Sequence, residues 1–137
     1  MALVCIGMLL VSCGSKRLDN PKAQFIRDFG LNIEKKDCVL EELFNNYEGV
    51  PYEGIALYKL TIGEDVRQAF LQWERFPFSE KAEHFLESLS AYVELPSIAD
   101  GYWKMVDRNP GTSAYTNVSL CVYDGATGAA YLLTMDI

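Results

Sequence analysis

The stretch that decides the fold covers residues 54–73 and reads GIALYKLTIGEDVRQAFLQW. In its first half, alternation predicts a strand with one better-buried face, formed by Ala56, Tyr58, Leu60 and Ile62. In its second half the spacing becomes i, i+3, i+4 and i+7, which predicts an amphipathic helix through Val66, Ala69, Phe70 and Trp73. Pro77 ends this helix, because proline lacks a backbone donor and restricts the residue before it.

The same change of period appears on the carboxyl side of this stretch. Ser79 has the side chain of a helix N-cap, and it precedes apolar residues at helical spacing: Ala82, Phe85, Leu86 and Leu89. Three strands are then predicted over residues 102–107, 118–123 and 131–137. The sequence DGATG at residues 124–128 predicts a hairpin loop between the last two.

The segments before residue 54 are less uniform. Residues 21–29 predict a short helix that Asp19 or Asn20 caps and Gly30 ends. Residues 34–46 fit two structures. Their composition and periodicity slightly favour a helix, whereas the charged residues 34–37 also fit a turn between two short strands.

These elements predict the α+β class. We expect a small antiparallel sheet of about four to five strands, with two helices inserted between the early and the late strands and packed on one face. Residues 23–137 are one domain's worth of chain, so we expect them to form a single α+β domain.

The start of the chain indicates where this domain works. An uncharged apolar run at residues 2–11 leads into Leu10-Val11-Ser12-Cys13, which resembles the lipobox of bacterial lipoproteins. In such proteins the cysteine is acylated, for example with palmitate, and becomes the first mature residue. The run is too short for a membrane-spanning helix, which needs about 20 apolar residues, but it matches the core of a signal peptide.

We therefore expect three parts in the lipoprotein: residues 1–12 as signal peptide, residues 13–22 as lipidated cysteine and tether with Cys13 as the lipidation site, and residues 23–137 as the domain. This places the domain on the extracytoplasmic side of the cell membrane, with the lipid on Cys13 as its membrane contact. No Lys or Arg precedes the apolar run, so we also expect a start codon further upstream.

Charge and composition exclude some partners. The formal net charge of −7 repels phosphate backbones and argues against nucleic-acid binding. An aromatic content of 12% argues against disorder. The chain has no Gly-rich phosphate loop, nucleophile elbow or zinc signature, so we expect no cofactor, no metal site and no catalytic residue.

Cys38 and Cys121 are the two cysteines that remain after the signal peptide and the lipidated Cys13 are set aside. In an oxidising compartment they fit either a disulfide bridge or two separate half-buried thiols. Neither has a second cysteine nearby in sequence, so a CxxC redox or zinc motif is excluded.

The polar candidates have simple structural interpretations. His84 falls on the polar side of its predicted helix, and Glu41 with Glu42 fits a solvated charge pair. Asp107-Arg108 fits either a structural ion pair or turn cap, or part of a ligand-facing loop. Asp124 most simply begins a turn.

The aromatic residues around Pro77 are the best candidates for a recognition surface: Trp73, Phe76, Phe78, Tyr102 and Trp103, with Tyr92 nearby. Aromatic side chains beside a proline often line partner sites. The same residues also fit an aromatic core.

Three stretches carry a resemblance to a known group: YEGIALYKL at 52–60, LPSIADGYW at 95–103, and NVSLCVYD at 117–124 with YLLTMD at 131–136. Together they resemble small uncharacterised lipoproteins of clostridia-like Gram-positive bacteria, over residues 30–137. The resemblance implies a strand pair at residues 31–43 and so favours a strand at 38–43. That group has no assigned activity and supplies no catalytic residues.

We therefore expect a non-enzymatic, membrane-tethered extracytoplasmic domain that binds a protein or an envelope component. The alternative is an acidic inhibitory or immunity-type module that blocks a basic partner. An enzyme would need a deep pocket with a carboxyl group of raised pKa.

Overall fold

The computed structural model describes residues 21–31, 33, 38–49, 53–111 and 116–137. Along the chain it contains α2 (Pro21–Phe29), β1 (Val39–Asn45), β2 (Gly54–Thr61), α3 (Glu64–Phe70), β3 (Glu74–Arg75), α4 (Glu80–Ser88), β4 (Gly101–Asp107), β5 (Asn117–Asp124) and β6 (Ala129–Asp136). The α+β class is confirmed. Residues 1–12 and Cys13 lie outside the described residues. None of the described helices is long and apolar enough to cross a bilayer.

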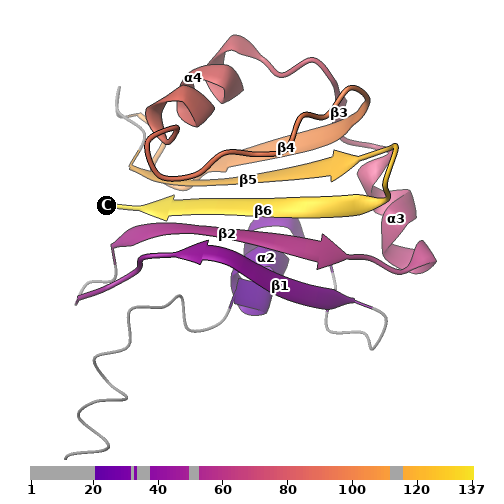
Figure 1. Ribbon diagram of the computed structural model, residues 1–137, viewed down its shortest axis with the longest axis horizontal. Helices are drawn as coiled ribbons and strands as arrows, with labels where there is room; N and C mark the ends of the chain where they lie inside the picture. Colours follow the sequence, from indigo (N-terminus) through magenta and orange to yellow (C-terminus); the bar gives the residue numbers. More distant parts are fainter. Residues whose placement is uncertain (1–20, 32, 34–37, 50–52, 112–115) are drawn as a thin grey trace, which may run out of the picture.

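The strands form one antiparallel sheet in the order β1-β2-β6-β5-β4-β3 (Figure 1). β6 lies in the interior of the sheet, so that Leu132 pairs with Tyr58 of β2 on one side and with Cys121 of β5 on the other. The six strands exceed the expected four to five. Within the range that fitted either a helix or a strand, Val39–Asn45 form β1, while residues 34–37 lie outside the described residues. β3 is too short to produce a periodic pattern.

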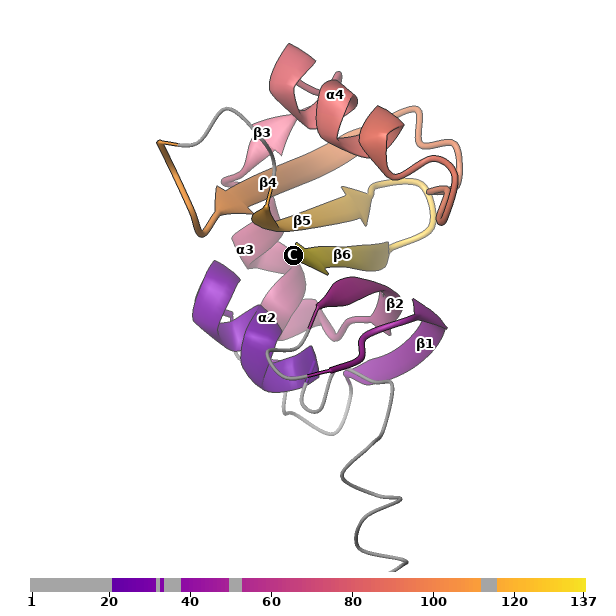
Figure 2. The same cartoon turned by 90° about the vertical axis from the view of Figure 1, so that its left-hand side faces the viewer.

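The inner strands are buried on both faces. Every residue of β5 after Asn117 is buried, and every residue of β6 before Asp136 is buried. Because side chains alternate between the two faces of a strand, this pattern requires a covering layer on each side of the sheet. Figure 2 shows these layers, with α2 and α3 on one side and α4 on the other.

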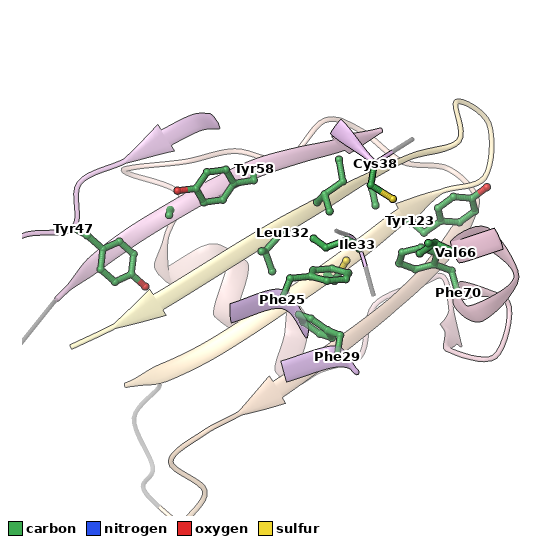
Figure 3. Close-up of a cluster of buried hydrophobic side chains, with 14 residues drawn as sticks. Phe25, Phe29, Ile33, Cys38, Tyr47, Tyr58, Val66, Phe70, Tyr123 and Leu132 are labelled. Atoms are coloured by element: carbon green, nitrogen blue, oxygen red, sulfur yellow. The ribbon is translucent and has the colours of Figure 1, made fainter. Parts of the chain in front are cut away.

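The face under α2 and α3, called here the α2 face, carries an aromatic-rich core (Figure 3). Phe25 and Phe29 of α2 pack with their ring centroids 5.2 Å apart. Phe70 of α3 stacks on Tyr123 of β5 at 5.1 Å. The strands contribute Ala56, Tyr58, Leu60, Cys121, Tyr123, Ala130 and Leu132 to this face.

The opposite face, called here the α4 face, carries a second core in which Ala82, Phe85 and Leu89 cover the sheet. The strands contribute Ile55, Leu57, Trp103, Val118, Leu120, Val122, Tyr131, Leu133 and Met135. The expectation that both inserted helices pack on one face is therefore wrong. Ser119 and Thr134 are polar residues buried on the α2 face, where their hydroxyls are hydrogen-bonded to each other at 3.2 Å.

The ends of the helices show which of the predicted start and stop signals are used in the structure. α2 ends before Gly30 as predicted, although it begins at Pro21, within the expected tether. α4 begins after Ser79 as predicted, and the Ser79 Oγ accepts a hydrogen bond from the Ala82 amide at 3.2 Å. α3 ends at Phe70 rather than at Trp73, because residues 74–75 leave the helix to pair with β4.

Candidate functional site

An apolar groove of about 410 Å³ opens on the α4 face. Three stretches of chain line it: residues 76–78, one side of α4, and residues 93–98. Its apolar lining consists of Phe76, Pro77, Phe78, Leu86, Val93, Leu95, Pro96 and Ile98. This volume and composition are typical of sites that bind ligands.

Backbone hydrogen bonds anchor the two segments that line the groove before and after α4. At the end of α4, the amides of Tyr92 and Val93 both donate to the carbonyl of Leu89, at 2.9 and 3.0 Å, and this turn leads into residues 93–98. Before α4, the Phe76 amide donates to the carbonyl of Gly101 at 3.2 Å. The lining segments are thus fixed to the helix at one end and to the sheet at the other.

Aromatic packing fixes residues 76–78 beneath the groove. The rings of Phe76 and Phe78 lie 4.5 Å apart, and Phe78 lies 5.7 Å from Trp103. The indole Nε1 of Trp103 donates to the carbonyl of Pro77 at 3.3 Å. Phe76 and Phe78 remain half-buried, whereas Trp103 is buried in the core. Two of these rings are therefore accessible to a ligand.

The charged residues that line the groove are both acidic. Glu83 comes from α4 and Glu94 from the segment after it, and both are exposed. At about 100° per residue, Glu80 and Glu87 lie on the same flank of α4 as Glu83. Lys81 lies on the other flank, where it pairs with Asp107 at 3.6 Å. The groove therefore has a negative edge.

The five aromatic residues expected to form one recognition surface do not do so. Trp73 and Tyr102 belong to the α2 face, where Trp73 packs against Phe70 with ring centroids 4.6 Å apart. Phe76, Phe78 and Trp103 belong to the α4 face. The sheet separates the two groups because Tyr102 and Trp103 are consecutive on one strand, and consecutive side chains point to opposite faces.

The other side of the groove has no recognisable motif in the sequence. Leu86 fits the apolar stripe of α4 and Glu83 its polar side, and neither pattern indicates a groove. Val93, Leu95, Pro96 and Ile98 lie in a stretch that matches neither helical nor strand period. One signal was available in the sequence. Several apolar residues stand close together in the loop after α4, and a cluster of apolar residues at the surface often marks an interaction site.

Cys38 and Cys121 are free thiols, both buried on the α2 face. Of the two alternatives, the structure therefore has separate thiols rather than a bridge. Cys121 lies on β5 and Cys38 lies one residue before the edge strand β1, and β6 and β2 lie between these two strands. Burial raises the pKa of the Cys121 thiol, which keeps it protonated and unreactive.

A second polar arrangement lies on the α2 face around Arg108. Its guanidinium forms ion pairs with Asp28 of α2, at 2.9 Å, and with Asp136 of β6. The Asp28 side chain is only 3% exposed, and Arg108 is 18% exposed. The Ser119 hydroxyl donates to the same Asp28 oxygen at 2.5 Å. Further hydrogen bonds to Arg108 and Asp28 come from Ser119, Thr134, the Met135 carbonyl and Gln24.

This arrangement decides between the two interpretations of Asp107-Arg108. The Asp107 carboxylate accepts from the Asn109 amide at 3.0 Å and so caps the turn, while Arg108 joins α2 to the sheet. Both residues hold the fold together, and neither faces the groove of Phe76 and Phe78.

Tyr47 extends the Arg108 cluster, since its hydroxyl donates to Asp136 Oδ2 at 2.8 Å. Burial, followed by the neighbouring carboxylate of Asp136, raises the pKa of this phenol well above its usual range. The unfolded state therefore loses the proton first, and the free energy of unfolding falls as pH rises above about 10. We expect Tyr47→Phe to lose this part of the alkaline decline in denaturant titrations between pH 8 and 11.

The matched control for Tyr47 is Tyr92→Phe, because Tyr92 is 57% exposed and lies outside the Arg108 cluster. We expect Tyr92→Phe to follow the wild-type decline. An unchanged alkaline decline in Tyr47→Phe would contradict the assignment.

The remaining polar candidates lie where simple interpretations place them. His84 is exposed on α4, and Glu41 and Glu42 are exposed on the edge strand β1. Asp124 Oδ1 accepts from the Ala126 amide at 2.9 Å, which forms the predicted turn. Within the described part of the chain, no group of three or more His, Cys, Asp or Glu side chains is placed to hold a metal ion.

Comparison with known proteins gives no family for this chain: no protein-family model, curated protein or solved structure matches it.

Proposed function

We propose that this protein is a membrane-tethered extracytoplasmic lipoprotein whose domain binds a protein or envelope component in the groove on the α4 face. The observation that carries the proposal is the groove itself, with the half-buried rings of Phe76 and Phe78 and a volume of about 410 Å³. Concave, mainly apolar sites of this volume are where proteins usually bind ligands. The groove offers carboxylates and hydroxyls rather than an activated nucleophile, which supports binding rather than catalysis.

The position of the groove fits a tether at the amino end. The described chain enters the domain through α2, on the face opposite α4 (Figure 2). In the proposed lipoprotein, the chain from Cys13 joins the described domain at Pro21, the first residue of α2. The groove on the α4 side is then free to meet a partner.

The test places a photo-reactive amino acid at Ser97, an exposed residue that lines the groove, in the full chain expressed in bacterial cells. We expect a discrete cross-linked product in the membrane fraction. The matched control is the same amino acid at Gln68, which is exposed on α3 on the other side of the sheet. Equal yields from the two positions, or none from either, would contradict groove binding.

The tether is tested in the same cells by mass. We expect the membrane-bound chain to carry a diacylglyceryl group that is lost in Cys13→Ala, with loss of membrane association. A soluble, unmodified wild-type chain would contradict the lipoprotein assignment.

A further inference from the structure

The groove combines an apolar floor with carboxylates from two separate stretches of chain. Glu83 is presented by α4, and Glu94 by the segment that follows α4. The rings of Phe76 and Phe78 and the side chain of Leu86 supply apolar surface for the same ligand. Both carboxylates are exposed, so each attracts a cation with the modest strength of a surface charge, while the apolar walls contribute by burying apolar surface of the ligand.

The charged groups of the groove favour a ligand that donates hydrogen bonds. Carboxylates only accept hydrogen bonds, and the described residues that line the groove include neither Lys nor Arg. The Ser90 hydroxyl already donates to the Glu87 carbonyl at 2.8 Å. An ammonium or guanidinium group is therefore the complement of this edge, and an anion is repelled by it.

Charge also separates the alternative occupants. A second copy of this chain brings a further net charge of −7, and anionic lipid headgroups are repelled in the same way. A small amine supplies one cation, whereas the groove presents carboxylates on two stretches of chain. A peptide with basic residues on both sides of an apolar one satisfies both carboxylates and the rings together.

We propose that the groove binds a basic, amphipathic peptide segment of a partner protein, with an apolar side chain against Phe76, Phe78 and Leu86 and with Lys or Arg beside Glu83 and Glu94. This inference rests on the proposed function, in which the groove is the binding site, and adds the chemistry of the partner. It makes the acidic edge the determinant of specificity and the apolar floor the source of affinity.

The test measures binding of four short synthetic peptides to the full chain in non-ionic detergent, by fluorescence anisotropy with an uncharged dye. Their sequences are KLFLK, SLFLS, ELFLE and KSGSK. We expect KLFLK to bind about tenfold more tightly than SLFLS, since two ion pairs of modest strength together give about this factor. We expect ELFLE and KSGSK to bind more weakly than SLFLS.

Two double variants locate the effect. Glu83→Gln with Glu94→Gln removes the groove carboxylates, and we expect it to weaken KLFLK by about tenfold while leaving SLFLS unchanged. Glu41→Gln with Glu42→Gln removes two exposed carboxylates from β1, the edge strand distant from α4, and makes the same change in net charge. We expect this control to bind KLFLK as the wild type does.

The outcomes distinguish a failure of the basic specificity from a failure of the proposed groove binding. If SLFLS binds as tightly as KLFLK, the groove binds apolar ligands and the basic specificity is wrong. If both double variants weaken KLFLK equally, total charge rather than the groove edge is responsible, and the inference is again wrong. If neither KLFLK nor SLFLS binds more tightly than KSGSK, both the proposed groove binding and the inference are wrong.

Discussion

We expect Arg108→Met to lower the free energy of unfolding by about 3 kcal/mol, because it removes one partner of a buried ion pair and leaves Asp28 with only the exposed Arg27, at 4.0 Å, as a cationic neighbour among the described residues. The Asp28 side chain is 3% exposed and accepts hydrogen bonds from Arg108, Ser119 and Gln24. Methionine keeps much of the volume of arginine but none of its donors. Denaturant titration followed by circular dichroism measures the change.

Arg75→Met is the matched control for Arg108→Met. Arg75 pairs with Asp100 at 3.5 Å, but the two side chains are 68% and 73% exposed. We expect this change to alter stability by less than about 1 kcal/mol, as surface ion pairs do. If the Arg108 variant fails to fold, Asp28→Asn offers a milder loss of the same pair. Similar, small effects at Arg108 and Arg75 would show that the buried cluster contributes little.

We expect Gly101→Ala to destabilise the domain by at least about 3 kcal/mol. The added methyl group would clash with backbone atoms, which cannot move aside as a flexible side chain can. A Cβ atom on Gly101 would lie 1.9 Å from the carbonyl oxygen of Tyr123. Gly101 pairs with Asp124 at the start of β4, and its own carbonyl accepts from Phe76. A shift of Gly101 therefore displaces the aromatic segment of the groove as well.

Gly125→Ala is the comparison for Gly101→Ala, because it lies in the adjacent turn. Its Cβ would be 3.2 Å from the carbonyl oxygen of Asp100, and the turn can absorb a few tenths of an ångström. We expect a loss below about 1 kcal/mol. Denaturant midpoints measure both variants, and tryptophan fluorescence reports the contact between Trp103 and Pro77. Equal losses in the two variants would contradict the close approach of β4 and β5.

The elements that were predictable from the sequence are those with strong local patterns. α4 has both a side-chain cap at Ser79 and an apolar stripe, and the structure has the helix where those residues place it. β1 was ambiguous because Leu40 and Phe44 fit a helical spacing as well as a strand. Pairing with β2 decides between the two, and this pairing is a tertiary effect that no local pattern contains.

The faces of the sheet were less predictable than its strands. Ser119 and Thr134 are polar, so the alternation of residue types alone does not predict that their side of β5 and β6 is buried. Burying them depends on Asp28 and Arg108, which are far apart in the sequence and meet only after folding. The same limit applies to the groove: Phe76 and Phe78 were found from their composition, but Val93, Leu95 and Ile98 join them only through the fold.

The interior position of β6 has a consequence for how the protein is made. Tyr58 pairs with Leu132, a residue 74 positions later. Until β6 has been synthesised, β1–β2 and β3–β4–β5 are two separate half-sheets without a common partner. Such long-range pairing slows folding, because the ends of a long loop must meet before the pairing can stabilise them. A nascent chain therefore cannot join its two half-sheets before residues 129–136 have been made.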